Sequence, residues 1–267
     1  MAHTDFYDSN FGRAAEEALT SVRNVAFLGE DFGQFSWITA DEHRKMQRRL
    51  GIGVHSSVLE IASGSGGPGL FLARSTGCTV LGIDVHEAGV ATANATATAE
   101  GLDGRASFIV HDARTPLPFD DASFDAIVCI DSINHLFDRR PVFSEWHRVL
   151  KAAGAAWYTD PAVVVGPLRR EEILARSPSM GEFVFTPQGR DEQLLLDAGF
   201  TKVTVEDLTA EIAGVAHRWH TARHSASALL IRSEGPEGYA AFQTFLATVG
   251  DLASSGRLGR FAMTATR

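Results

Sequence analysis

The chain has 267 residues, of which 45% are hydrophobic and 21% charged, with only 2 cysteines. A chain of this length fits one large α/β domain, and it buries enough surface to fold without disulfide bonds. Lysine and arginine number 24 against 33 aspartates and glutamates, and the resulting net charge of −9 disfavours a nucleic-acid-binding protein.

Targeting signals are not expected. Residues 1–13 contain Asp5 and Asp8 and lack an apolar stretch, so they do not resemble a signal peptide. No segment approaches the roughly 18 uninterrupted apolar residues of a membrane-spanning helix. Cys78 and Cys129 match no zinc or redox spacing. We therefore expect a cytoplasmic protein, a monomer or homodimer, that binds neither membranes nor nucleic acid.

The first two thirds of the chain predict alternating strands and helices. Residues 11–27 have the apolar spacing of an amphipathic helix, and a second helix is expected from 39 to 50. The expected strands after it are residues 58–62, 79–83, 107–110, 124–130 and 155–159. The expected helices between them are residues 68–75, 88–100 and 141–150, the last with Gly154 as its stop signal. This alternation predicts βαβ units and a mostly parallel sheet with helices on both faces.

The last third is less regular. The expected elements are a helix at 191–198, a strand at 202–205, helices at 211–231 and 236–253, and a strand at 260–266. Because the two longer helices precede the terminal strand, we expect them to form a lid over the ligand-binding edge of the sheet.

A glycine-rich turn in residues 58–69 lies between a strand and a helix, where α/β sheets bind ligands. It satisfies G-x-G-x-x-G from Gly64 onward, and Asp84 follows twenty positions later. Glu60 argues against a pyrophosphate, because a carboxylate repels that anion and attracts an ammonium. Asp84 can accept hydrogen bonds from ribose hydroxyls of either ligand. The turn alone therefore leaves open both NAD and S-adenosylmethionine.

Further motifs follow in order. Asp112 follows the third expected strand, residues 118–131 supply the fourth, and residues 150–154 end the next helix. With these motifs the chain resembles the class I S-adenosylmethionine-dependent methyltransferases over about residues 33–160. Ala62 departs from the family, which usually has the first glycine of its acidic-x-Gly-x-Gly-x-Gly motif at that position.

The resemblance implies a Rossmann-like, seven-stranded, mostly parallel sheet and S-adenosylmethionine as cofactor. It implies N-terminal helices and a cofactor-covering loop in residues 1–50, and a methyltransferase domain in residues 51–267 with its helical lid at about 208–256. The residues expected to bind the cofactor are Trp37, Glu60, Ala62, Gly64, Gly66, Asp84, Val85, Asp112, Ala113 and Ile130.

A finer resemblance is to small-molecule methyltransferases that act on glycine, sarcosine or dimethylglycine and on phosphoethanolamine. It rests on residues 33–39, on Asp131-Ser-Ile-Asn-His135, and on Trp219-His220. In the phosphoethanolamine enzymes a tyrosine and the histidine matching His135 act as a pair. Residues 33–39 contain no tyrosine, which argues against a phosphobase substrate.

His135 is the candidate general base, because a neutral imidazole accepts a proton near pH 7. The alternative is a loop histidine bonded to the backbone. Asp131, the second candidate catalytic residue, either orients a cationic amine or caps its turn. The aromatic faces near it either stabilise positive charge or pack in the core. The residues expected to contact the substrate are Phe35, Trp37, Asp131, Trp219, His220 and Arg223.

No metal site is expected. His217, His220 and His224 recur at helical spacing, but no carboxylate joins them at ligand spacing. The expected function is S-adenosylmethionine-dependent methyl transfer to a small-molecule nucleophile, first of all an amine nitrogen, by in-line displacement. The alternatives are a natural-product O- or C-methyltransferase and an NAD-dependent oxidoreductase. The short-chain oxidoreductases are excluded, because no tyrosine has a lysine four positions later.

Overall fold

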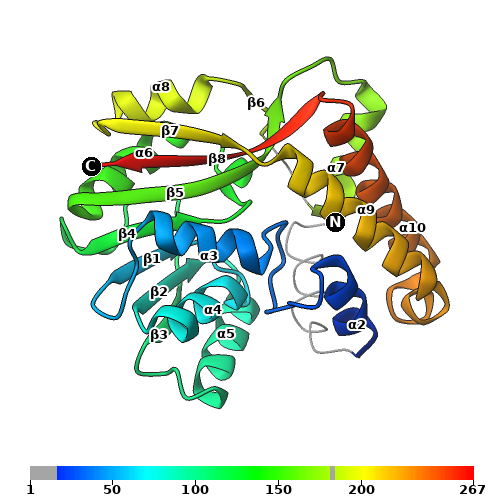
Figure 1. Cartoon of the computed structure of the whole chain (residues 1–267), viewed down its shortest axis with the longest axis horizontal. Coiled ribbons are helices and arrows are strands. Elements are labelled where there is room, and N and C mark those ends of the chain that lie inside the picture. The colour runs from blue at the N-terminus through cyan, green and yellow to red at the C-terminus, as the bar shows by residue number, and fades with distance from the viewer. Residues whose placement is uncertain (1–16, 181–183) are drawn as a thin grey trace.

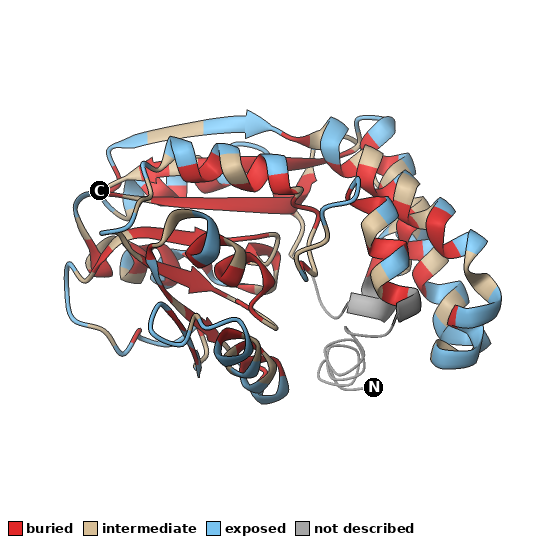
Figure 2. Cartoon of the chain, turned by 60° about the horizontal axis from the view of Figure 1, so that its bottom comes forward, coloured by how far each residue is buried: buried red, intermediate tan, exposed pale blue. Residues whose placement is uncertain are grey.

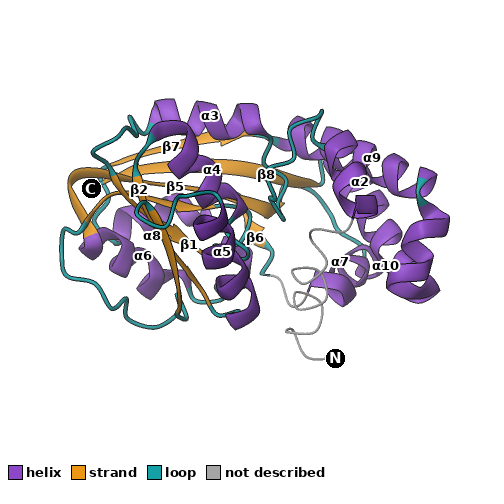
Figure 3. Cartoon of the chain, turned by 90° about the horizontal axis from the view of Figure 1, so that it is seen from below, coloured by secondary structure: helices purple, strands orange, loops and turns teal. Residues whose placement is uncertain are grey.

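The structure, a computed structural model, describes residues 17–180 and 184–267. It is an α/β sandwich in which helices cover both faces of one central sheet (Figures 1 and 3). The expected N-terminal helix corresponds to α2 (Glu17–Ala26). Residues 1–16, which include the start of that expected helix and the segment that does not resemble a signal peptide, lie outside the described residues. Among the described residues no helix has the length and apolar content needed to span a membrane.

The sheet has eight strands. They are β1 (Ser57–Ile61), β2 (Thr79–Asp84), β3 (Ala106–Val110), β4 (Phe124–Cys129), β5 (Leu150–Val164), β6 (Thr186–Pro187), β7 (Lys202–Asp207) and β8 (Leu258–Thr266). Their order is β3-β2-β1-β4-β5-β8-β7, and β6 pairs with β5 beside this path. Only β8 runs antiparallel to its neighbours. The expected Rossmann-like, mostly parallel sheet is confirmed. The eighth strand is β6, whose two residues are too few to give a sequence pattern.

Two helical layers enclose the sheet. The remaining helices are α3 (Ala40–Arg49), α4 (Gly67–Thr76), α5 (Glu87–Ala99), α6 (Arg139–Val149), α7 (Arg170–Met180), α8 (Arg190–Asp197), α9 (Thr209–Ser225) and α10 (Ser227–Ser254), with a 3-10 turn η1 (Ile133–His135). Helices α3, α4 and α5 pack their apolar side chains on one face of the sheet, and α6 and α8 pack on the other. The central strands β1 and β4 are mostly buried, whereas the edge strand β7 is mostly exposed (Figure 2).

Helices α2, α7, α9 and α10 gather at one end of the sheet, at the right of Figure 1. Helices α9 and α10 connect β7 to β8, and α10 kinks at Gly235, whose φ is +76°. The buried face of α2, α9 and α10 forms a third apolar cluster, which includes Trp37 from the loop before α3. The segment before α3 is therefore in contact with the helices that precede the last strand.

The strand order reverses between β1 and β4. From β1 the chain proceeds to β2 and β3 on one side, whereas β4 and β5 are added on the other. In open α/β sheets, ligands bind in the crevice at such a reversal, beyond the carboxyl ends of the strands. The glycine-rich turn after β1 and residues 130–135 after β4 lie at this position.

Candidate active site

A cleft of about 360 Å³ opens at the carboxyl ends of β1, β2 and β4. Its wall brings together twelve of the residues expected from the sequence to bind cofactor or substrate or to act in catalysis. They are Phe35, Trp37, Glu60, Ala62, Gly64, Asp84, Val85, Asp112, Ala113, Ile130, Asp131 and His135. These residues come from five separate segments, so the fold assembles a candidate site from parts that are distant in sequence.

Four expected site residues lie outside this wall. Gly66 is the N-cap of α4, and a Cβ there would lie 2.7 Å from that of Ala93, so its small size serves packing. Arg223 lies inside the lid, where its guanidinium pairs with Glu234 at 2.5 Å. Trp219 packs edge-on against aromatic rings of the wall, and the carbonyl of His220 accepts a hydrogen bond within the lid. Trp219, His220 and Arg223 thus lie on α9 and do not line the cleft.

The glycine-rich turn brings backbone close to the cleft. Ala62 and Gly64 both have positive φ, +56° and +54°. A Cβ on Gly67 would lie 2.4 Å from the carbonyl oxygen of Gly33, so residues 33–37 cross directly over the turn. A Cβ on Gly69 would lie 2.3 Å from Oε2 of Glu60. The last two glycines therefore make room for the covering segment and for the Glu60 carboxylate.

Glu60 presents a carboxylate inside the cleft wall. Its side chain is on β1 and is only 2% exposed. Burial, with a further contribution from the charge of Asp84, raises the pKa of Glu60 to about 8. Its Oε2 is buried and makes no hydrogen bond to the described residues. A buried acceptor without a partner is costly, so this atom fits a ligand that donates from a charged ammonium.

Asp84 ends β2 and contacts the turn. Its Oδ2 accepts from the backbone N–H of Gly64 at 2.8 Å, and its Oδ1 accepts from that of His86 at 2.9 Å. Burial raises the pKa of Asp84, and these two hydrogen bonds oppose the rise. Each carboxylate oxygen can accept more than one hydrogen bond, so Asp84 keeps capacity for two ribose hydroxyls.

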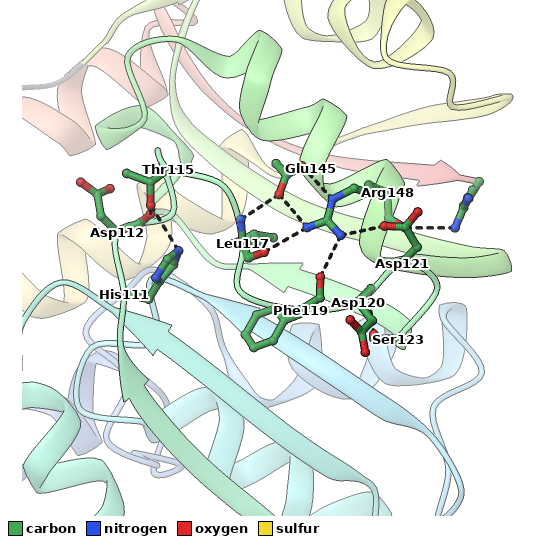
Figure 4. Close-up of polar contacts among 11 residues, drawn as sticks. His111, Asp112, Thr115, Leu117, Phe119, Asp120, Asp121, Ser123, Glu145 and Arg148 are labelled. Atoms are coloured by element: carbon green, nitrogen blue, oxygen red, sulfur yellow. Dashed lines mark hydrogen bonds and ion pairs between the residues drawn. The ribbon is translucent and has the colours of Figure 1, made fainter.

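Asp112 lies in the loop after β3 (Figure 4). Its Oδ2 accepts from Nη2 of Arg114 at 2.7 Å, and hydrogen bonding to Arg114 lowers the pKa of the Asp112 carboxyl. Helix α6 fixes the continuation of this loop. Glu145 accepts from the backbone N–H of Leu117 at 2.7 Å, and Arg148 donates to two carbonyls of the loop. The loop after β3, which lines the cleft, is thus held by side chains of α6.

The carboxylate of Asp131 accepts hydrogen bonds from two of the described residues. Its Oδ1 accepts from Nε of Arg260 at 2.7 Å, and its Oδ2 accepts from the backbone N–H of Trp37 at 2.8 Å. Its φ is +53°, a conformation that aspartate tolerates better than most residues. The ion pair with Arg260 offsets the negative charge of Asp131, which is the charge that would orient a cationic amine.

His135 ends the 3-10 turn that follows β4, and its side chain lines the cleft. The turn is closed by a backbone hydrogen bond of 3.0 Å from the N–H of His135 to the carbonyl of Ser132. His135 and Asp131 thus both line the cleft from the segment that follows β4.

Two of the wall residues that were not foreseen from the sequence, Arg176 and Phe245, come from helices α7 and α10. Arg176 of α7 is 1% exposed, and burial lowers its pKa to about 10, so it stays charged at neutral pH. Its Cζ lies 5.8 Å from the ring centre of Phe245, which stacks on Trp37 at 5.9 Å. Helix α7 has no sharp amphipathic pattern, and nothing local in the sequence distinguishes Arg176 from a surface arginine.

The sequence is similar to those of methyltransferases. Residues 58–154 match a methyltransferase domain family. The chain is 38% identical over 119 residues to methyltransferase GfsG of Streptomyces halstedii, covering 45% of this chain and 42% of that protein. It is 32% identical over 154 residues to 27-O-demethylrifamycin SV methyltransferase of Amycolatopsis mediterranei, covering 57% and 56%. The chain thus spans about half the length of these curated relatives.

Solved structures share the fold. One is a Haemonchus contortus phosphoethanolamine N-methyltransferase 2, with a TM-score of 0.82 and 20% identity over 100% of this chain and 60% of that chain. A putative sarcosine dimethylglycine methyltransferase from Galdieria sulphuraria has a TM-score of 0.75 and 18% identity, covering 85% and 83%. The [4+2]-cyclase SpnF has a TM-score of 0.71 and 23% identity, covering 94% and 92%. The sequence match thus assigns residues 58–154 to a methyltransferase domain family, and these solved structures share the fold of the chain.

Proposed function

We propose that the protein transfers a methyl group from S-adenosylmethionine to a nucleophile of a small molecule, an amine nitrogen in the first instance. The observation that carries this proposal is the composition of one cleft. It combines the carboxylates of Glu60 and Asp84 at the glycine-rich turn with an imidazole, His135, and the aromatic rings of Phe35 and Trp37. The two carboxylates suit binding of the cofactor, and the imidazole and the aromatic rings suit the place where the methyl group is transferred.

The cofactor-side residues have separate roles. Glu60 accepts from the cofactor ammonium, Asp84 from the ribose hydroxyls, and Asp112 from the adenine amino group. Bound S-adenosylmethionine supplies an electrophilic methyl group on a positively charged sulfur. The protein's own contribution is alignment of the acceptor with that group and exclusion of water by the lid, and alignment alone can contribute about 7–11 kcal/mol.

At the reacting end, His135 takes the proton that an amine must lose before it attacks. The rings of Phe35 and Trp37 stabilise the positive charge that develops on nitrogen, by about 0.5–2 kcal/mol each. Because Asp131 is paired with Arg260, it does not serve as the main anchor of an ammonium.

A second candidate, O- or C-methylation of a natural product, is favoured by Arg176. This buried cation lines the same wall and repels a cationic acceptor, whereas it attracts a phenolate, enolate or carboxylate. Among the similar proteins named above, one methylates an oxygen of a rifamycin by its printed name. One structural neighbour is named a [4+2]-cyclase, so the fold alone does not establish methyl transfer, and the transfer must be measured.

The decisive experiment uses S-adenosylmethionine labelled with carbon-13 in the methyl group and a panel of amines, phenols and β-dicarbonyl compounds. The carbon-13 chemical shift of the product distinguishes N-, O- and C-methyl groups. Appearance of an N-methyl signal supports the amine proposal, and an O- or C-methyl signal supports the second candidate. If the protein binds the cofactor but forms no labelled product with any acceptor class, methyl transfer to these classes is contradicted.

Two substitutions test the residue roles. Asp84→Ala is expected to weaken cofactor binding in a calorimetric titration, because the ribose acceptor is lost. His135→Ala is expected to reduce turnover far more than cofactor affinity. An unchanged rate in His135→Ala would remove its role as the base.

A further inference from the structure

A buried ion-pair cluster lies behind the cleft. Arg260 of β8 is 0% exposed, and the side chains of its two partners, Glu42 and Asp131, are 8% and 4% exposed. Arg260 donates to both oxygens of Glu42 at 2.8 Å, and to Asp131 through Nε at 2.7 Å and Nη2 at 3.1 Å. We call these three residues the Arg260 cluster.

The cluster reaches the cleft through Asp131. The Oδ2 atom that accepts from Arg260 also accepts from the backbone N–H of Trp37 at 2.8 Å. Trp37 lines the cleft and ends the segment 33–37 that crosses the glycine-rich turn at Gly67. This segment is thus attached at two places: on the turn by close backbone packing, and at the end of β4 by Asp131.

The cluster also contacts the origin of the lid helices. The backbone N–H of Arg260 donates to Oγ1 of Thr209, the first residue of α9, at 3.2 Å. The carbonyl of Arg260 accepts from the N–H of Leu208 at 2.8 Å. One residue therefore joins α3, the end of β4 and the base of the lid.

We propose that Arg260 is a positioning residue of the cofactor cleft, which holds Asp131 and, through it, the Trp37 segment over the glycine-rich turn. Arginine suits this task because its planar guanidinium binds two carboxylates with parallel hydrogen bonds, which lysine cannot do. Without Arg260, two carboxylates stay buried beside each other with no cation between them, and Asp131 loses the partner that fixes its orientation.

Electrostatics support the arrangement. Burial raises the pKa of Glu42, and the nearby charge of Asp131 adds to the rise against the opposing effect of Arg260. Burial works to lower the pKa of Arg260, but attraction to Asp131 and Glu42 raises it above its ordinary value. Arg260 therefore stays charged at neutral pH.

The test measures the affinity for S-adenosylhomocysteine by calorimetry in the full chain, at a temperature where circular dichroism shows each variant folded. Arg260→Met and Asp131→Asn are each expected to weaken binding about tenfold or more, the range of one charge-assisted hydrogen bond. Arg260→Lys is expected to recover part of the loss. Arg49→Met, which breaks an exposed α3 ion pair with Glu206, is the control with unchanged affinity.

A second readout separates positioning from mere stabilisation. Trp37 stacks on Phe245, and Trp37→Phe identifies its contribution to the near-ultraviolet circular dichroism. That contribution is expected to disappear in Arg260→Met and Asp131→Asn and to persist in Arg49→Met. The proposal is overturned if folded Arg260→Met or Asp131→Asn keeps both the Trp37 signal and wild-type affinity. If the unsubstituted protein does not bind S-adenosylhomocysteine, the cofactor assignment fails, and the Trp37 signal alone tests whether Arg260 positions the Trp37 segment.

Discussion

Glu60 links cofactor binding to proton release. With a pKa of about 8, its carboxyl is about one-tenth ionised at pH 7, so ionising it costs about 1.4 kcal/mol, and about 2.7 kcal/mol at pH 6. A cofactor ammonium binds the ionised form. We therefore expect binding at pH 7 to release about 0.9 proton per cofactor, and affinity to fall about tenfold from pH 7 to pH 6.

The measurement is calorimetric titration with S-adenosylmethionine in phosphate and in Tris buffer, whose ionisation enthalpies differ. The dependence of the binding enthalpy on the buffer gives the number of protons released. Glu60→Gln should bring this number close to zero and flatten the pH dependence. Asp84→Asn should reduce it in part, because the charge of Asp84 contributes to the raised pKa of Glu60. Equal proton release by wild type and Glu60→Gln would refute the reasoning.

The same group affects the stability of the cofactor-free protein. The folded-state pKa of Glu60, about 8, lies above its ordinary value of 4.5, so the folded state binds an extra proton between these pH values. Its contribution to stability is complete below pH 4.5 and is lost as the pH rises through 8. Urea denaturation should show that Glu60→Gln removes this part of the pH dependence, and an unchanged profile would contradict it.

Three further predictions concern other wall residues. Ala62→Gly should raise the free energy of unfolding in a urea titration by about 0.5–1 kcal/mol, because Ala62 has a positive φ that glycine adopts more easily. The control Ala95→Gly, within α5, should lower it by about 1 kcal/mol in the same titration. Gly67→Ala should weaken binding of S-adenosylhomocysteine at least tenfold because its Cβ meets backbone; equal affinity of Gly67→Ala and the control Gly53→Ala would contradict this. Arg176→Met should raise the KM for an anionic acceptor at least tenfold and leave cofactor affinity within twofold; an unchanged KM would exclude an acceptor contact.

The part of the cleft that is built from strand ends was predictable from local sequence. Glu60, Asp84, Asp112 and Asp131 each lie in or directly after a strand, and parallel strands bring their carboxyl ends to one edge. Each residue could therefore be placed from its own strand alone, without knowing any long-range contact. The glycine-rich turn adds its own signal, because its spacing and its position between strand and helix are both local.

The lid side was not predictable in the same way. Arg223 was expected to contact substrate, but its guanidinium pairs with Glu234, which lies in the interval between the expected helices 211–231 and 236–253, and no local pattern indicates this pairing. Arg176 reaches the wall from a helix that the sequence pattern did not predict. Gly154 was read as a helix stop, but it lies inside β5, where a Cβ would meet backbone oxygens at about 3 Å. Each case depends on tertiary contacts.

The position of Arg260 along the chain has a consequence for biosynthesis. Asp131 precedes it by 129 residues and Glu42 by 218 residues, so both carboxylates leave the ribosome long before their shared cation. A nascent chain that compacts early brings two negative charges together with nothing to neutralise them. Such an intermediate is disfavoured until the final strand inserts between β5 and β7. Maturation of the binding cleft therefore waits for the synthesis of β8, and a chain cut short before this strand lacks it.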